Sequence, residues 1–160
     1  MSSKNEEILG AWAEFFVSHA LAVRAIEAQM ETQSPLSMDG YDVLLAISRA
    51  PGQRLRFSDL ADTTVYTRSG ITRIMKRYEE KGYISREECP EDKRGSFAVL
   101  TDKGKKVLRE AWRWYSKGIL EVFGNCFKEK EAQTLRSLMQ KLANSLSPPK
   151  LVQLQIKKTY

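Results

Sequence analysis

The sequence predicts a mainly α fold of the α+β class, because three kinds of pattern follow one another along its 160 residues. Apolar residues spaced three and four apart, which mark one face of a helix, fill long stretches near both ends. Shorter stretches with the same spacing occupy the middle of the chain. After these come two short strand-like runs around a turn that is rich in charge, Pro and Gly, which is typical of a β-hairpin.

Two helices and a very short strand are expected at the start of the chain. The range 5–31 is expected to form one long helix, since apolar and aromatic residues recur on one face; they are Ile8, Trp12, Phe15, Phe16, His19, Val23, Ile26 and Met30. A second helix is expected over 38–49, and Pro51-Gly52 ends it. The range 54–57 alternates and predicts a short strand. Ser58 is then expected to cap a short helix over 59–63.

The range 67–81 has the clearest amphipathic pattern in the chain. Ile71, Ile74, Met75 and Tyr78 fall at i, i+3, i+4 and i+7 and so share one narrow face. The other positions carry hydroxyl and cationic side chains and no acid before Glu79; they are Thr67, Arg68, Ser69, Thr72, Arg73, Lys76 and Arg77. This pattern predicts a helix that buries one face and presents Ser69, Arg73 and Lys76 on the other, with Thr72 and Arg77 beside them. Arg68 lies nearer the apolar side, so it is expected either to contact the DNA backbone or to fold against the domain.

A hairpin and two more helices are expected to complete the fold. One strand begins at 83–86, a turn occupies 90–95, and the return strand covers 96–100. Helices are expected over 102–125 and 128–146, while the tail has no assignment. A helix-turn-helix followed by a hairpin is a winged helix-turn-helix, in which the second helix of the pair enters the DNA major groove.

The charge distribution favours a polyanionic partner. Residues 1–53 carry 3 Lys/Arg and 7 Asp/Glu, residues 54–109 carry 14 and 9, and residues 110–160 carry 9 and 4. An acidic start is thus followed by a basic middle and end, within a net charge of +6. A solvated basic surface is the alternative to a nucleic-acid partner.

The turn sequence Asp92-Lys93-Arg94-Gly95 predicts that the hairpin contacts DNA. An arginine at the tip of a wing is favoured in a narrow minor groove, where negative potential is concentrated. Asp92 can hold the Arg94 guanidinium in place by a charge-assisted hydrogen bond. The alternative is a turn whose charges serve solubility only.

The segment TRSGITRIMKRYEEKGYISREECPEDKRGSFAVLTDKGKKVL resembles the MarR (multiple antibiotic resistance regulator) family of bacterial transcription factors. The resemblance rests on the Thr/Ser-rich helix start, the EEKGYISR helix exit, the Asp-x-Arg wing and the LTDKG stretch. In the order of its elements it covers about residues 6–146.

The resemblance implies a cytoplasmic bacterial or archaeal homodimer, usually a repressor that binds double-stranded DNA. It implies that the polar residues of 67–77 contact the major groove, that Arg94 enters the minor groove beside Lys93 with support from Asp92, and that Arg86 anchors the wing or the DNA backbone. It also implies a small aromatic or anionic effector. Trp12, Phe16, His19 and Tyr41 are the candidate ligand-binding residues, with core or dimer contacts as the alternative.

A dimer is also expected from the residues themselves, because the terminal helices carry more apolar surface than one winged domain can cover. We therefore expect a helical dimerisation region over 1–36 and 102–146, a DNA-binding domain over 37–101, and a tail of unknown structure over 147–160. A twofold dimer favours an inverted-repeat operator with half-sites about one DNA turn apart.

Several other classes of protein are disfavoured. His19 is the only histidine, and no catalytic set, phosphate loop or metal cluster is apparent, so an enzyme is not expected. No stretch is judged apolar enough to cross a membrane, and the N-terminus lacks a signal core. Cys126 is expected to be buried; Cys89 follows two glutamates, which disfavour a thiolate, although redox sensing stays open for both. A winged-helix protein-interaction module and an activator remain as alternatives.

Overall fold

The structure is a computed structural model that describes residues 3–64, 67–89 and 92–146, except the side chains of 61–63 and 92–94. The fold is mainly helical with a small antiparallel sheet, as the sequence predicts. The helices are α1 (Ser3–Gln33), α2 (Met38–Arg49), α3 (Phe57–Thr63), α4 (Arg68–Glu80), α5 (Asp102–Val122) and α6 (Glu129–Leu146), with 3-10 turns η1 (Pro51–Gln53) and η2 (Gly124–Cys126). The strands are β1 (Arg54–Arg56), β2 (Ile84–Cys89) and β3 (Asp92–Leu100).

The predicted elements are present, and the differences at their ends include three with a clear local cause. Ser58 is not the cap of α3: the helix begins directly after β1, with Arg56 at the N-cap, and the Ser58 hydroxyl donates to Asp59 instead. The return strand β3 begins at Asp92, earlier than expected, because it continues to pair with β2 through a bulge at Glu88/Cys89. The fifth helix ends at Val122, and a 3-10 turn follows it.

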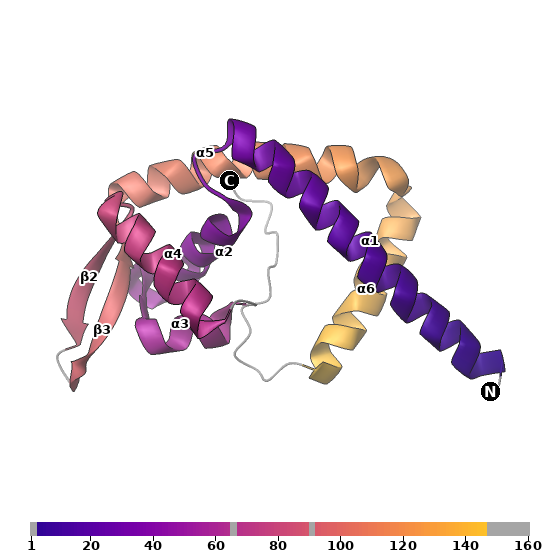
Figure 1. Ribbon diagram of the computed structural model, residues 1–160, viewed down its shortest axis with the longest axis horizontal. Helices are drawn as coiled ribbons and strands as arrows, with labels where there is room; N and C mark the ends of the chain where they lie inside the picture. The colour runs from indigo at the N-terminus through magenta and orange to yellow at the C-terminus, as the bar shows by residue number, and fades with distance from the viewer. Residues whose placement is uncertain (1–2, 65–66, 90–91, 147–160) are drawn as a thin grey trace.

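The sheet has the order β1-β3-β2, and both pairings are antiparallel. Ala98 at its centre pairs with Leu55 on one side and Arg86 on the other, and its side chain is fully buried. The core gathers the buried faces of α2 and α4 with one end of each long helix, namely Ile26 and Met30 of α1 and Val107, Leu108 and Ala111 of α5. Figure 1 shows this winged part at one end, with α1 and α5 extending away from it.

The joint between α4 and α5 is held by the residues of the LTDKG stretch. The Thr101 hydroxyl accepts a hydrogen bond from the Gly104 amide (3.0 Å) and is 2.8 Å from the Gly82 carbonyl oxygen, to which it donates. Lys103 donates to the Lys81 carbonyl oxygen over 2.8 Å. A Cβ atom at position 104 would overlap the carbonyl oxygen of Tyr83, so only glycine allows this close approach.

The long terminal helices carry a large exposed apolar surface in the single chain. Its members are Ile8, Leu9, Trp12, Phe15, Phe16, Val17 and Leu21 of α1, with Leu120, Phe123, Phe127, Leu138, Leu142 and Leu146 of the C-terminal region. No described residue of α6 is buried. A surface of this extent is typical of a face that a partner covers.

Two expectations about these helices were wrong. By length and composition α1 is apolar enough to cross a membrane, and none of its most apolar window is buried. A criterion that requires an uninterrupted apolar run excludes this helix, because Glu14, Ser18, His19 and Arg24 interrupt the run. Cys126 is exposed rather than buried, since it lies in η2 beyond the end of the packed part of α5, whereas Cys89 is buried.

Candidate nucleic-acid interface

The helix α4 separates its packing residues from its polar residues. Ile71, Ile74, Met75 and Tyr78 are buried in the core, each no more than 3% exposed. Thr67 is the N-cap, and its hydroxyl accepts a hydrogen bond from the Gly70 amide over 3.3 Å. The helix therefore begins one residue later than expected, with Thr67 fixing its first turn.

The end of α4 is set by a left-handed glycine. Gly82 has φ +70°. Its amide donates a hydrogen bond to the Glu79 carbonyl oxygen (2.9 Å), and the Tyr83 amide donates one to the Tyr78 carbonyl oxygen (2.9 Å). This pattern is the Schellman motif that ends many helices. The KGYI stretch thus turns the chain directly from α4 into the hairpin.

The outer face of α4 presents hydrogen-bond donors and carries no acid before Glu79. Thr67, Arg68, Ser69, Thr72, Arg73 and Lys76 are all exposed. Helical spacing predicted this for Ser69, Arg73 and Lys76, whereas it placed Arg68 nearer the apolar side. Among the residues that the structure describes, no carboxylate pairs with the three cations of this set. The Thr72 hydroxyl donates to the Arg68 carbonyl oxygen over 3.0 Å, and its oxygen still faces the surface. Such a face suits phosphates and base edges.

Arg77 differs from the other predicted contacts because its guanidinium lies against α2. Its Nη2 atom donates to the Ser37 hydroxyl (3.1 Å) and to the Tyr78 hydroxyl (3.3 Å), and it lies 3.6 Å from a carboxylate oxygen of Asp39. Helical spacing placed Arg77 beside the polar face, which is correct. It could not show that α2 provides oxygen atoms on that flank.

Arg86 connects the wing to the two helices beside it. Its guanidinium carbon lies 4.2 Å from the centre of the Phe57 ring of α3, and its Nε atom lies 3.5 Å from a carboxylate oxygen of Glu79 in α4. It also donates to the Ser96 hydroxyl on β3 at 3.5 Å. These contacts fit the predicted anchoring of the wing better than a direct contact with DNA.

The wing residues Asp92, Lys93 and Arg94 lie at the start of β3 by their backbone. Their side chains are outside the described part of the structure. The predicted support of Arg94 by Asp92, and the entry of Arg94 into the minor groove, therefore stay predictions.

The outer face of the sheet carries a cationic group that sequence reasoning missed. Arg54 and Arg56 of β1 lie over the Phe97 ring at 4.9 and 5.6 Å, and Arg56 donates to the buried Cys89 sulfur over 3.2 Å. The alternation of Arg-Leu-Arg in the sequence indicated that both arginines share a face. Only the strand order shows that this face adjoins Cys89, for which the sequence suggested acidic neighbours alone.

The four candidate ligand residues fall into two groups within the chain. Trp12 and Phe16 stack at 6.2 Å on the exposed part of α1, and His19 lies on the same helix. Tyr41 is 2% exposed and packs against α5, with its ring 6.0 Å from that of Trp112 and 5.0 Å from that of Tyr115. No ring contact joins the two groups among the described residues, so a shared ligand cavity stays a prediction.

Burial also changes the acidity of Tyr115, whose ring contacts that of Tyr41. The pKa of Tyr115 is raised to about 12, first by burial and then by the negative charges of Asp42 and Glu27. Its hydroxyl is therefore protonated at neutral pH.

Among the described residues no group of three His, Cys, Asp or Glu side chains could hold a metal ion.

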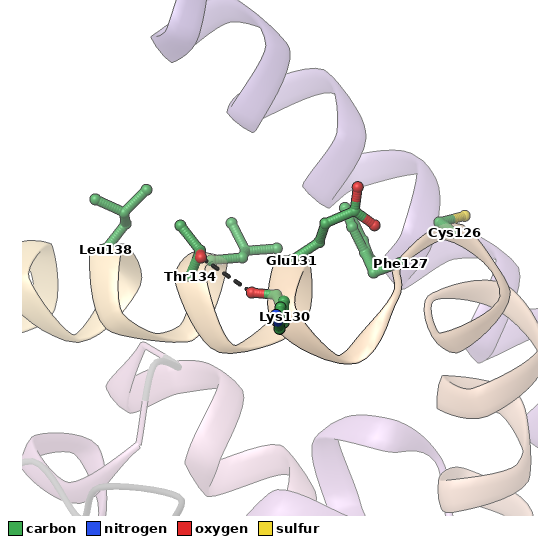
Figure 2. Close-up of a pocket in the computed structure, with 7 residues that line it drawn as sticks. Cys126, Phe127, Lys130, Glu131, Thr134 and Leu138 are labelled. Atoms are coloured by element: carbon green, nitrogen blue, oxygen red, sulfur yellow. Dashed lines mark hydrogen bonds between the residues drawn. The ribbon is translucent and has the colours of Figure 1, made fainter.

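An open groove of about 480 Å³ follows η2 and the start of α6. It is lined by Cys126, Phe127, Lys130, Glu131, Thr134, Leu135 and Leu138. Figure 2 shows Phe127, Glu131, Thr134 and Leu138 projecting from the same side of this segment. Phe127 and Leu138 belong to the exposed apolar surface described above, so the groove is part of that surface rather than an enclosed ligand cavity.

Known proteins match both the central segment and the whole fold. A model of the MarR family matches residues 36–95. The transcriptional regulator HosA of Escherichia coli O111:H- is 29% identical over 110 residues, which are 69% of this chain and 79% of HosA. The crystal structure of Sco3205, a MarR family transcriptional regulator from Streptomyces coelicolor in complex with DNA, is 26% identical, with a TM-score of 0.78 over 95% of this chain and 94% of that one.

Residues 36–95 thus match the MarR family of transcriptional regulators, and the whole fold matches solved structures of that family. A second MarR family regulator from Streptomyces coelicolor, AbsC, matches with a TM-score of 0.74 at 26% identity and covers 91% of this chain and 96% of that one. The MarR resemblance predicted from the sequence is thus confirmed. The match extends over the long terminal helices as well as the winged part.

Proposed function

We propose that this chain is a cytoplasmic homodimeric repressor that binds an inverted-repeat operator in double-stranded DNA. The observation that carries the proposal is the division of α4 into a buried apolar face and an exposed face that carries hydrogen-bond donors and, over residues 67–77, no acid. In a winged helix-turn-helix this exposed face is the one that can enter the major groove. The DNA complex of Sco3205, a similar chain, supports the same use of the fold.

The charges of the outer face favour DNA over a protein partner. Arg73 and Lys76 lie one turn apart on α4, and no described carboxylate neutralises them. An interface for another protein typically contains apolar anchors at its centre, and this face has none. Arginine can pair with guanine through two hydrogen bonds, while lysine supplies a point charge for phosphate.

A homodimer accounts for the exposed apolar surface of the terminal helices. Trp12 and Phe16 are 60% and 61% exposed in the single chain, and α6 buries none of its described residues. A second copy that covers these residues would remove a large apolar area from water. Because α1 and α5 both enter the winged core, such a dimer would also fix the separation of the two α4 helices.

Release by a small aromatic or anionic effector is the further part of the proposal. Tyr41 is the candidate residue that connects the winged part to a long terminal helix, since it lies on α2 and its ring packs against α5. The test is a calorimetric titration with aromatic carboxylates, followed by DNA binding in the presence of any compound that binds. Compounds that bind without lowering the DNA affinity would contradict this part.

The experiment that tests DNA binding is selection from a random duplex pool, repeated across a salt series. We expect an enriched inverted repeat whose half-sites lie about one helical turn apart. We also expect the logarithm of affinity to fall linearly and steeply with the logarithm of salt concentration. A pool without enrichment would contradict sequence-specific binding and favour a protein-interaction module.

A further inference from the structure

We propose that Arg77 is a positioning residue that locks the end of α4 to the first turn of α2 and does not itself contact DNA. The lock consists of Ser37, Asp39, Arg77 and Tyr78. The inference rests on the proposed function, because it concerns how the DNA-facing helix is held in its orientation.

The contacts of the lock converge on one hydroxyl. The Ser37 oxygen lies 3.1 Å from the Nη2 atom of Arg77 and 3.1 Å from the Tyr78 hydroxyl, and its own hydroxyl donates to Asp39. The guanidinium carbon of Arg77 also lies 4.9 Å from the centre of the Tyr78 ring. The cation is therefore directed toward α2, unlike Arg73, which has no such partner among the described residues.

Asp39 contacts both the backbone of α2 and the side chains of the lock. Its carboxylate accepts a hydrogen bond from the Gly40 amide over 2.7 Å at the first turn of the helix. A carboxylate at this end is stabilised by the helix dipole. Arg77 and Asp39 thus connect the last turn of α4 to the first turn of α2 through charge-assisted contacts.

The lock lies where the chain passes from α1 into the winged part. The Ser34 amide donates to the Met30 carbonyl oxygen (2.8 Å), and the Leu36 amide donates to the Ser34 hydroxyl (3.1 Å). Ser37 follows directly. A change in the lock would therefore alter the angle between α4 and α1, which carries the exposed apolar surface assigned to the dimer.

Asp39 provides a test with opposite expectations. If charge alone mattered, replacing an acid near a DNA-binding face would strengthen binding. If the lock positions α4, Asp39→Asn should weaken binding by about threefold to tenfold, because the ion pair with Arg77 is lost. Glu80→Gln is the matched control: it removes an exposed acid from the last turn of α4 outside the lock, and affinity should stay equal or rise.

The experiment uses the full chain and the selected operator across a salt series, with urea unfolding of each variant. We expect Arg77→Gln to lower affinity by about tenfold at every salt concentration without changing the salt slope. Arg73→Ala should instead reduce the slope by about 0.9 if it removes one phosphate contact. The double variant Asp39→Asn/Arg77→Gln should bind the operator no more weakly than Arg77→Gln alone. Its loss of unfolding free energy should be smaller than the sum of the losses of the two single variants.

Four results would overturn the proposal. Tighter binding by Asp39→Asn, or a slope reduced by about 0.9 in Arg77→Gln, would make Arg77 a phosphate contact. If the effects of the substitutions at 39 and 77 are additive in both operator binding and urea unfolding, the two residues do not act together and the lock is rejected. If the wild-type chain selects no DNA while the unfolding coupling persists, the proposed function and the positioning role both fail, and only the structural contact between α2 and α4 stands.

Discussion

The backbone of Gly40 lies directly against the hydroxyl group of Tyr78, so that a Cβ atom at position 40 would overlap the tyrosine oxygen. Gly40 is in the first turn of α2, and Tyr78 is the last buried residue of α4. The two helices can approach this closely only because residue 40 has no side chain. The contact fixes the depth at which α4 lies in the fold.

Gly40→Ala should therefore destabilise the protein by about 1–3 kcal/mol, because the methyl group displaces a buried ring from a packed core. Urea unfolding measures the change. Gly10→Ala is the control, since a Cβ at Gly10 meets nothing within 4 Å and alanine is the better helix former. A loss of stability in the control equal to that of Gly40→Ala would show that the contact with Tyr78 is not the cause.

Arg73→Ala should weaken operator binding by about 1–3 kcal/mol and relax the base preference at one position of each half-site. The physical reason is the loss of an exposed guanidinium from the outer face of α4. Competition between the operator and its single-base variants measures both effects. Arg24→Ala, which removes an exposed cation from α1, should leave the preference unchanged; an equal loss for every DNA sequence would make Arg73 a phosphate contact only.

Tyr115 should make the folded state sensitive to alkaline pH. A tyrosine that titrates near 10.0 when unfolded and at about 12 when folded stabilises the fold fully below pH 10, and this contribution is lost as the pH rises through 12. Between pH 9 and pH 11 the wild type should lose about 1 kcal/mol more than Tyr115→Phe. Urea unfolding at the two pH values measures this, and equal losses in both proteins would contradict the raised pKa.

Trp12→Glu should weaken the homodimer by about 2–4 kcal/mol, because it places a charge in the exposed apolar face of α1. Sedimentation across a range of protein concentrations measures the monomer–dimer equilibrium. Lys4→Glu introduces an acid about one turn before Ile8, the first apolar residue of that face, and should have little effect. A wild-type chain that sediments as a monomer at all concentrations would remove the dimer from the proposal.

The sequence predicted α4 well because local spacing alone determines which of its residues are buried. Ile71, Ile74, Met75 and Tyr78 have to share a face in any helix over this range. Their burial and the exposure of Arg73 and Lys76 are both confirmed. The hairpin could likewise be predicted from local sequence, because the residues at 90–95 are of types that favour a turn.

Contacts between distant segments could not be predicted. Ser37 and Asp39 approach Arg77 only after α2 and α4 have packed together, and Arg56 reaches Cys89 only because β1 pairs with β3. Side-chain spacing specifies a direction on one element but not the neighbour in that direction. The same limit explains Ser58: the N-cap position of α3 is occupied by Arg56, without a side-chain capping hydrogen bond, because β1 continues to that residue.

The residues that pack α4 into the core and those on its outer face form separate sets. Exchanges among exposed positions such as Arg68, Ser69, Thr72, Arg73 and Lys76 should typically change stability by no more than about 0.5 kcal/mol. The preferred operator can therefore diverge after gene duplication without passing through unfolded intermediates. The same separation lets an engineer retarget the protein by varying the outer face while the scaffold stays constant.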